Sequence, residues 1–277
     1  MLDQARRQQA SKVVDPAPGH LDPVTAGFYR HAMSSLNDAA LPFLVGGAYA
    51  FERYTGIARH TKDFDIFVRP SDRDRVLNAL AVAGYHTELA FPHWLGKAFH
   101  RDAFVDVIWS SGNGIAQVDD EWFTHAVTSR VLAVPAWLCP PEEMIWSKAF
   151  VMERERYDGN DVAHLLRGCA DRLAWRRLLR RFGPDWRILL GHLVLFGFIY
   201  PSERSRVPAW VTALLSRRLA DETDTAPPGD RLCRGTLLSR VQYLVDVSDW
   251  GYRDARCSPT GSLSDEDIAR WTAAAAE

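Results

Sequence analysis

The chain has 277 residues, of which 47% are hydrophobic and 25% are charged, and its formal net charge is −2. This is ordinary globular composition, suited to one large domain or two modest ones, and it excludes the need for disulfides or structural metals to build a core. The near-neutral balance also excludes a partner attracted by overall charge, so any contact with nucleic acid needs a local patch.

The composition of particular segments indicates where the protein works. The N-terminus has no apolar run of the kind found in signal peptides. The longest apolar stretch, 189–200, is too short to span a bilayer, so we expect no membrane association. The cysteines are widely spaced and match no zinc or redox motif, which favours packed thiols in a reducing, cytoplasmic location. They are Cys139, Cys169, Cys233 and Cys257.

The first half of the chain alternates helical and strand patterns. Residues 1–24 are polar and read as a tail, and a helix is expected from Val24 to about Ala40. A second helix is predicted to begin at Ser71, where a carboxylate three residues later resembles a capping box. Short apolar runs predict strands, with Arg101-Asp102 as a hairpin turn between the last two. These strands are expected at 42–45, 63–68, 97–100 and 103–109.

The pattern changes to almost only helices after Trp137. The helices are expected at 141–156, 160–169, 172–182, 185–199, 208–221 and 234–248. The predicted fold class is α/β (α+β), with a small mixed β-sheet core and its helices followed by a mainly helical C-terminal module. The corresponding domains are an N-terminal tail at 1–24, a core at 25–138 and a helical module at 139–277.

Three aspartates form the strongest chemical pattern. Side chains alternate along a strand, so Asp63 and Asp65 share one face while Phe64, Ile66 and Val68 share the other. Two carboxylates this close repel each other unless a cation lies between them, and a hard divalent ion with oxygen ligands meets that need.

The third aspartate, Asp106, interrupts an apolar run, where an ionised carboxylate is costly without a partner. If its strand lies beside that of Asp63 and Asp65, the three can hold two magnesium ions that clamp the oxygens of a phosphoryl transfer.

A pair of glycines upstream fits phosphate binding. Gly46-Gly47 follows a predicted strand and precedes a helix, so the backbone can approach a phosphate at a positive helix N-terminus. Just before the first aspartate, Arg59, Thr61 and Lys62 lie where they could supply positive charge and hydrogen bonds to a triphosphate.

The order of these motifs resembles the DNA polymerase β nucleotidyltransferase superfamily. Within it, the run from Arg59 to Asp65 is similar to the Arg-x-Thr-x-Asp-x-Asp run of AbiEii-type toxins, and small antibiotic nucleotidyltransferases also resemble it. Lys148 in a helix, followed by Asp158-Gly-Asn-Asp161, looks like the lysine helix and Arg-Asp-x-x-Asp run of the same group.

The chain departs from the family pattern at two places. Tyr157 stands where the group has an arginine, and Arg154 or Arg156 could substitute. Ala48 stands where many members have a serine or threonine, so backbone N–H groups would have to contact the phosphate.

The resemblance implies roles for these residues. Asp63, Asp65 and Asp106 would be catalytic and hold two Mg²⁺ or Mn²⁺ ions, and Gly46 and Gly47 would cradle an NTP. Arg59, Thr61, Lys62 and Lys148 would complete the nucleotide site, in a cleft between the sheet and the helices that begin near Pro141. Alternatively, Lys148 is a solvated helix residue, and Asp158 and Asp161 cap a helix.

The acceptor of the transfer is the most open part of the interpretation. Six arginines between 172 and 187 lie on an amphipathic helix pattern and favour RNA or tRNA over a small molecule such as an antibiotic. A protein side chain is the third acceptor class left open. A toxin with an antitoxin partner is one implication of the resemblance. The alternatives are a small-molecule nucleotidyltransferase, a non-catalytic binding module of this fold, a divalent-cation phosphohydrolase, or, for the arginines, a solvated helix face.

Overall fold

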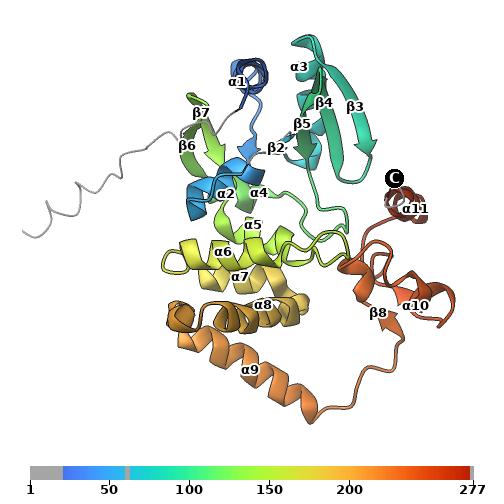
Figure 1. Ribbon diagram of the computed structural model, residues 1–277. Helices are drawn as coiled ribbons and strands as arrows, with labels where there is room; N and C mark the ends of the chain where they lie inside the picture. Colours follow the sequence, from blue (N-terminus) through green and yellow to red (C-terminus); the bar gives the residue numbers. More distant parts are fainter. Residues whose placement is uncertain (1–20, 60–62, 275–277) are drawn as a thin grey trace, which may run out of the picture.

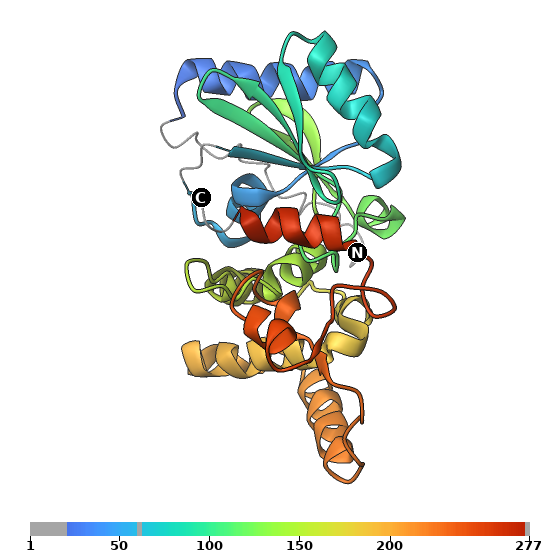
Figure 2. The same ribbon diagram turned by 90° about the vertical axis from the view of Figure 1, so that its right-hand side faces the viewer.

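The computed structural model describes residues 21–59 and 63–274. A β-sheet with helices on its faces lies above a stack of helices, and the C-terminal segment runs along the side of both (Figure 1, Figure 2). The predicted combination of a mixed sheet core with a mainly helical C-terminal part is confirmed.

Seven strands of the described residues form one mixed sheet, in the order β3-β4-β5-β2-β1-β7-β6. Strand β2 is parallel to β5 and antiparallel to β1, while β1 is parallel to β7. The predicted hairpin is confirmed, with β4 antiparallel to β5 across Arg101 and Asp102. The strands are β1 (Leu44–Val45), β2 (Asp63–Phe67), β3 (His86–Phe91), β4 (Leu95–His100), β5 (Ala103–Ile108), β6 (Val127–Val131) and β7 (Val134–Leu138).

Alternation along β2 decides which face of the sheet is core. Phe64 and Ile66 are buried, and Tyr29 of α1 (Pro23–Asp38) stacks on Phe64 with ring centroids 4.9 Å apart. Helix α1 begins after Asp22, whose carboxylate accepts hydrogen bonds from the N–H groups of Val24 and Thr25. The aspartates of β2 therefore face the opposite side, toward α2 (Gly47–Thr55) and the helical stack.

The second predicted helix begins later than expected. A 3₁₀ turn, η1 (Pro70–Asp72), precedes α3 (Arg73–Val82), and no side chain caps the first turn of α3. The predicted capping box at Ser71 is therefore wrong. The Asp72 carboxylate instead pairs with Arg75, at 3.1 Å, and with Arg69.

Five helices follow the sheet, as predicted, although the first is shorter. They are α5 (Pro141–Ala149), α6 (Gly159–Cys169), α7 (Trp175–Phe182), α8 (Trp186–Ile199) and α9 (Ala209–Thr223), and a short α4 (Asp120–Thr124) lies before β6. The helix predicted at 141–156 ends at Ala149, because Met152 pairs with Tyr157 as a bridge and donates its N–H to the carbonyl of Leu238.

The helix predicted at 234–248 is also wrong. The segment instead forms the 3₁₀ turn η4 (Gly235–Leu237) and the short helix α10 (Leu244–Ser248). Strands β8 (Leu232–Cys233) and β9 (Arg253–Asp254) pair in parallel beside it, and α11 (Asp265–Ala273) returns to the β3 side of the sheet (Figure 1).

One helical stretch, Trp175–Ile199, is long and apolar enough to cross a membrane by length and composition alone, a test that core helices of soluble proteins also pass. The 3₁₀ turn η2 (Gly183–Asp185) divides it into α7 and α8, and Arg177 lies buried on α7. The cysteines are unpaired, and Cys139, Cys169 and Cys233 are buried, as expected of packed thiols.

Candidate active site

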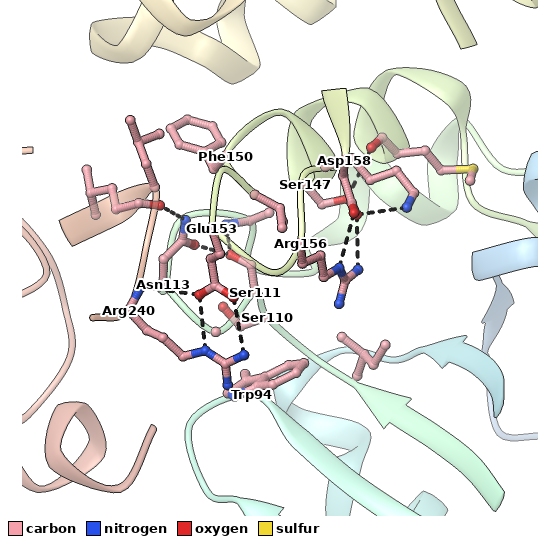
Figure 3. A pocket seen from close by; sticks show the side chains of 18 of the residues that line it. Trp94, Ser110, Ser111, Asn113, Ser147, Phe150, Glu153, Arg156, Asp158 and Arg240 are labelled. Carbon is pink, nitrogen blue, oxygen red and sulfur yellow. Dashed lines mark hydrogen bonds and ion pairs between the residues drawn. The ribbon is translucent and has the colours of Figure 1, made fainter. Parts of the chain in front are cut away.

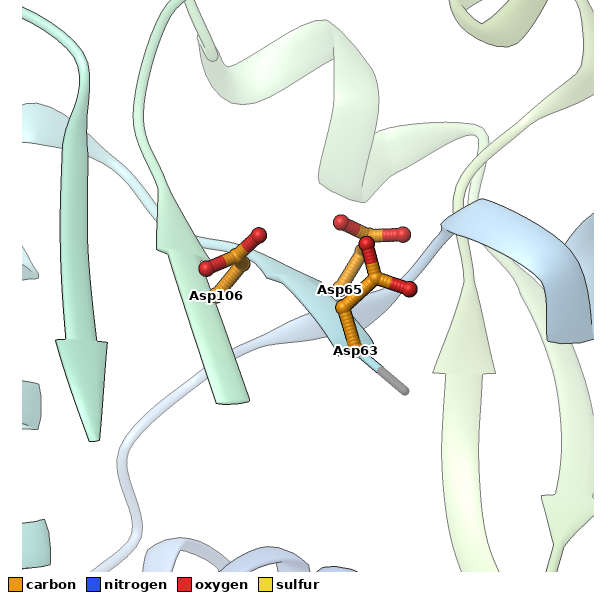
Figure 4. A group of neighbouring side chains, drawn as sticks. All are labelled: Asp63, Asp65 and Asp106. Carbon is orange, nitrogen blue, oxygen red and sulfur yellow. The ribbon is translucent and has the colours of Figure 1, made fainter. Parts of the chain in front are cut away.

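The sheet brings the three predicted aspartates together. In the parallel pairing of β2 with β5, Asp65 lies opposite Asp106, and Asp63 lies two residues from Asp65 on the same face. One oxygen from each of Asp63, Asp65 and Asp106 lies within 4.8 Å of the others (Figure 4). Carboxylate oxygens at this separation fit a hard divalent cation such as Mg²⁺ or Mn²⁺.

The electrostatics of this cluster also fit a cation. Burial, together with the charges of Asp63 and Asp106, raises the pKa of Asp65 to about 7, although Lys148 and Arg156 act against this. Burial likewise raises the pKa of Asp106, opposed by a hydrogen bond from Lys97. A bound divalent ion offsets this repulsion and keeps the carboxylates ionised.

The two predicted glycines press the start of α2 against the cluster. Gly47 has φ +50°, and a Cβ on it would lie 1.7 Å from Oδ2 of Asp65. A Cβ on Gly46 would lie 2.3 Å from the Phe67 ring, and the Gly46 N–H donates to the carbonyl of Asp65 at 3.0 Å. Only glycines allow this approach, which places a positive helix N-terminus beside the carboxylates.

We expect Gly47→Ala to weaken Mn²⁺ binding at the carboxylate cluster roughly 10- to 100-fold, because its methyl group would displace the Asp65 carboxylate. Titration with Mn²⁺ measures the effect. Gly56→Ala is the matched control, since Gly56 also has positive φ, +74°, but its Cβ would meet nothing within 4 Å. Equal losses in the two variants would assign the effect to backbone strain rather than to Asp65.

Lys148 is part of an ionic network rather than a solvated residue. Its Nζ lies 3.0 Å from Oδ2 of Asp158 and 2.8 Å from Oδ2 of Asp161. Arg59 pairs with Asp161 at 2.5 Å, and Arg156 pairs with Asp158 at 3.0 Å. Arg156 thus supplies the guanidinium that the sequence lacks at Tyr157. Asp158 occupies the N-cap position of α6 but makes no side-chain capping bond, so the capping alternative is wrong for this residue.

These ion pairs hold both aspartates of the network ionised. Burial alone would raise the pKa of Asp158, but hydrogen bonds from Arg156 and Lys148 hold it below its usual range. Burial is likewise outweighed at Asp161, where Arg59 and Lys148 keep the pKa low. The other two predicted residues, Thr61 and Lys62, lie outside the described residues.

A cavity of about 250 Å³ lies between Asp65 and the helical stack. Gly47 and Asp65 line it from the sheet side, and Ser147 and Lys148 line it from α5. The predicted cleft between the sheet and the helices that begin near Pro141 is therefore present. Its remaining wall is partly aromatic and partly polar (Figure 3). This wall includes Trp94, Ser110, Ser111, Asn113, Phe150, Glu153, Arg156, Arg240 and Trp271.

The C-terminal segment lines one part of the cavity, which sequence patterns did not indicate. Arg240 pairs with Glu153 through two nitrogens, at 3.1 and 3.2 Å, and Asn113 donates to the carbonyl of Leu237 at 2.7 Å (Figure 3). These contacts join segments 87 and 124 residues apart. Contacts between segments this far apart in the sequence cannot be predicted from a local motif.

Lys97 is a second residue that the motifs missed. Its Nζ lies 2.7 Å from Oδ1 of Asp106. The signal was present in the sequence, because an antiparallel register counted across the two-residue turn at Arg101-Asp102 places Lys97 opposite Asp106.

The arginine-rich stretch does not form the free basic face that the sequence suggested. Arg177 is buried with Glu142 and Glu143, and Arg181 pairs with Asp119 and Glu143. The other arginines remain more exposed, but they also have partners. Arg172 contacts Gly168 and Cys169, Arg176 lies over Trp210, Arg180 pairs with Glu121, and Arg187 pairs with Glu222.

Comparison with known proteins gives only remote likenesses. No protein-family model matches the sequence, and no curated protein matches it significantly. The solution structure of the antibiotic-resistance factor ANT(2'')-Ia is 14% identical with a TM-score of 0.38, over 73% of this chain and 97% of that one. The lincosamide antibiotic adenylyltransferase LnuA is 15% identical with a TM-score of 0.37, over 50% and 94%.

An antigenic nucleotidyltransferase-like protein from Paracoccidioides brasiliensis is 13% identical with a TM-score of 0.41, over 67% of this chain and 93% of that one. Similarity at this level is a distant likeness of shape. It carries no activity and no residue role over to this chain.

Proposed function

We propose that the protein is a metal-dependent nucleotidyltransferase that moves a nucleoside monophosphate from an NTP to an acceptor hydroxyl. The observation that carries the proposal is the grouping of Asp63, Asp65 and Asp106 beside the N-terminus of α2. Lys148 faces the same cavity from α5. Carboxylates for a divalent ion and groups for a polyphosphate thus lie together, as a phosphoryl transfer requires.

The residues have distinct roles in this reaction. Asp63 and Asp65 would hold a divalent ion, which supplies charge stabilisation for the phosphate oxygens when bound. The backbone at Gly46 and Gly47 contacts the triphosphate at the start of α2. Lys148, held by Asp158 and Asp161, orients its ammonium toward the departing pyrophosphate.

Asp106 serves the acceptor side of the reaction. The acceptor oxygen forms a bond to the α-phosphorus while the bond to the bridging oxygen of pyrophosphate breaks. Asp106 helps to take up the hydroxyl proton, since a buried carboxylate with a raised pKa is a better proton acceptor than an exposed one.

The acceptor is best matched by a small molecule, the alternative that the sequence left open. The RNA interpretation rested on the arginines of 172–187. Two of them, Arg177 and Arg181, instead form ion pairs with buried carboxylates. The half-open, partly aromatic cavity next to Asp65 suits a compact hydroxyl compound. An AbiEii-like toxin activity with an antitoxin partner stays a prediction from the sequence alone.

A labelling experiment tests the proposal. Each α-labelled NTP is incubated with the protein and Mg²⁺, once with total RNA and once with a pool of small hydroxyl compounds that includes aminoglycosides and lincosamides. We expect label in the small-molecule fraction and release of pyrophosphate. Label in RNA would restore the RNA interpretation, and NTP binding without any transfer would favour the non-catalytic binding module.

A further inference from the structure

Lys97 lies in register with the carboxylates. Strand β4 places it opposite Asp106 on β5, and β5 in turn places Asp106 opposite Asp65 on β2. Directly opposed residues project from the same face of a sheet, so the three side chains form one row across three neighbouring strands. The ammonium lies 2.7 Å from Oδ1 of Asp106 and 4.0 Å from the centroid of the Phe104 ring.

Two lysines of the described residues lie at the site and have different partners. Lys148 pairs with Asp158 and Asp161. Among the described residues, Lys97 forms its ion pair with Asp106 alone, and both side chains are largely buried, with 21% and 13% of their surface exposed. A charged pair this sheltered from water is screened far less than a surface pair, so the ammonium is a fixed charge of the carboxylate row.

The Lys97 ammonium has a consequence for the metal. It already supplies a positive charge at Oδ1 of Asp106. A second divalent ion bound to Asp106 would also lie within a few ångströms of the Lys97 ammonium, in surroundings where like charges repel strongly.

We propose that Lys97 takes the place of a second cation at Asp106, so that the site holds one divalent ion. It differs from the sequence-based prediction of two ions and deepens the proposed function, on whose metal site it rests. Lys97 is then a positioning residue. It holds Oδ1 of Asp106 and leaves Oδ2 to meet the acceptor hydroxyl, while Asp63 and Asp65 hold the ion.

Counting bound Mn²⁺ tests this directly and needs no turnover. Calorimetric and electron paramagnetic resonance titrations are run with a non-hydrolysable NTP analogue present. The wild type is expected to bind one Mn²⁺ per chain. Lys97→Met and Lys97→Gln are expected to bind a second, at least about tenfold tighter than any second ion in the wild type, because a nearby like charge has been removed.

Two further variants control for general effects of charge. Lys97→Arg keeps the cation and should keep one ion, and Arg101→Met removes a charge from the exposed turn of the same hairpin and should also keep one. Two ions in the wild type, or one ion in both Lys97→Met and Lys97→Gln, would overturn the role of Lys97 while leaving the proposed transferase intact. No bound Mn²⁺ in the wild type would contradict the carboxylate site itself, and with it both proposals.

Discussion

Asp65→Asn is expected to lower the rate of nucleotidyl transfer roughly 1000-fold or more, because loss of a metal-ligand charge removes several kcal/mol of transition-state stabilisation. The substitution keeps the shape of the side chain, so the Gly47 backbone that packs against it should be unaffected. The measurements are pyrophosphate release with saturating NTP and Mn²⁺ binding, which should weaken in parallel.

The same substitution separates a functional carboxylate from a structural one. Asp65 faces repulsion from Asp63 and Asp106, which together with burial raises its pKa. Removing its charge should therefore leave the metal-free protein at least as stable as the wild type in urea unfolding. If the Asp65 carboxylate instead stabilised the fold, Asp65→Asn would lower the free energy of unfolding. Asp102→Asn, in the exposed hairpin turn, is the matched control and should change neither activity nor stability. Full activity of the Asp65→Asn variant would contradict the assignment of Asp65 as a metal ligand.

The carboxylate site could be predicted from the sequence because its signals are local. The alternation in β2 fixes which side chains share the face of Asp63 and Asp65, and a two-residue periodicity is readable in five residues. The glycine pair directly before a helix is equally local. The adjacency of β2 and β5 was an assumption in the sequence interpretation, and the parallel register of Asp65 with Asp106 bears it out.

The rest of the site depends on long-range contacts that no local pattern carries. The Arg240–Glu153 pair and the Asn113–Leu237 hydrogen bond exist only because the C-terminal segment returns to the sheet. The failed helix at 234–248 has the same cause. Contacts with the 150–158 region, such as the Met152–Leu238 hydrogen bond, compete with helical hydrogen bonds, and tertiary contacts overrode local propensity.

The helix of the arginine-rich stretch was predicted correctly, whereas the pairing of Arg177 and Arg181 with buried carboxylates was not. The predicted amphipathic helix is present as α7, but composition cannot tell an exposed arginine from a buried one. Glu142 and Glu143 lie in the first turn of α5, where their charges favour the helix dipole. Their partners on α7, more than thirty residues away, could not be inferred from that turn.

A buried ionic cluster joins α5 to α7. Both Nη atoms of Arg177 contact the two glutamates, with Nη1 3.0 Å from each carboxylate oxygen of Glu143. The side chains of Arg177, Glu142 and Glu143 are only 6%, 3% and 0% exposed. Burial raises the pKa of Glu143 to about 7 even with Arg177 and Arg181 beside it. Removing one arginine would leave carboxylates that water cannot reach.

Arg177→Met is therefore expected to lower the free energy of unfolding by about 3–5 kcal/mol, the usual cost of breaking a buried ion pair from one side. Urea denaturation at pH 8 measures it, with Arg176→Met and Arg180→Met as controls on exposed positions of the same helix, each expected to cost less than about 1 kcal/mol.

The decrease in the free energy of unfolding caused by Arg177→Met should be smaller at pH 5.5. Without Arg177 the folded-state pKa of Glu143 rises further above its unfolded value, so the folded variant binds more protons than the unfolded chain and gains stability as the pH falls. A stable Arg177→Met protein that instead lost RNA affinity and its salt dependence would show that α7 is a nucleic-acid surface after all.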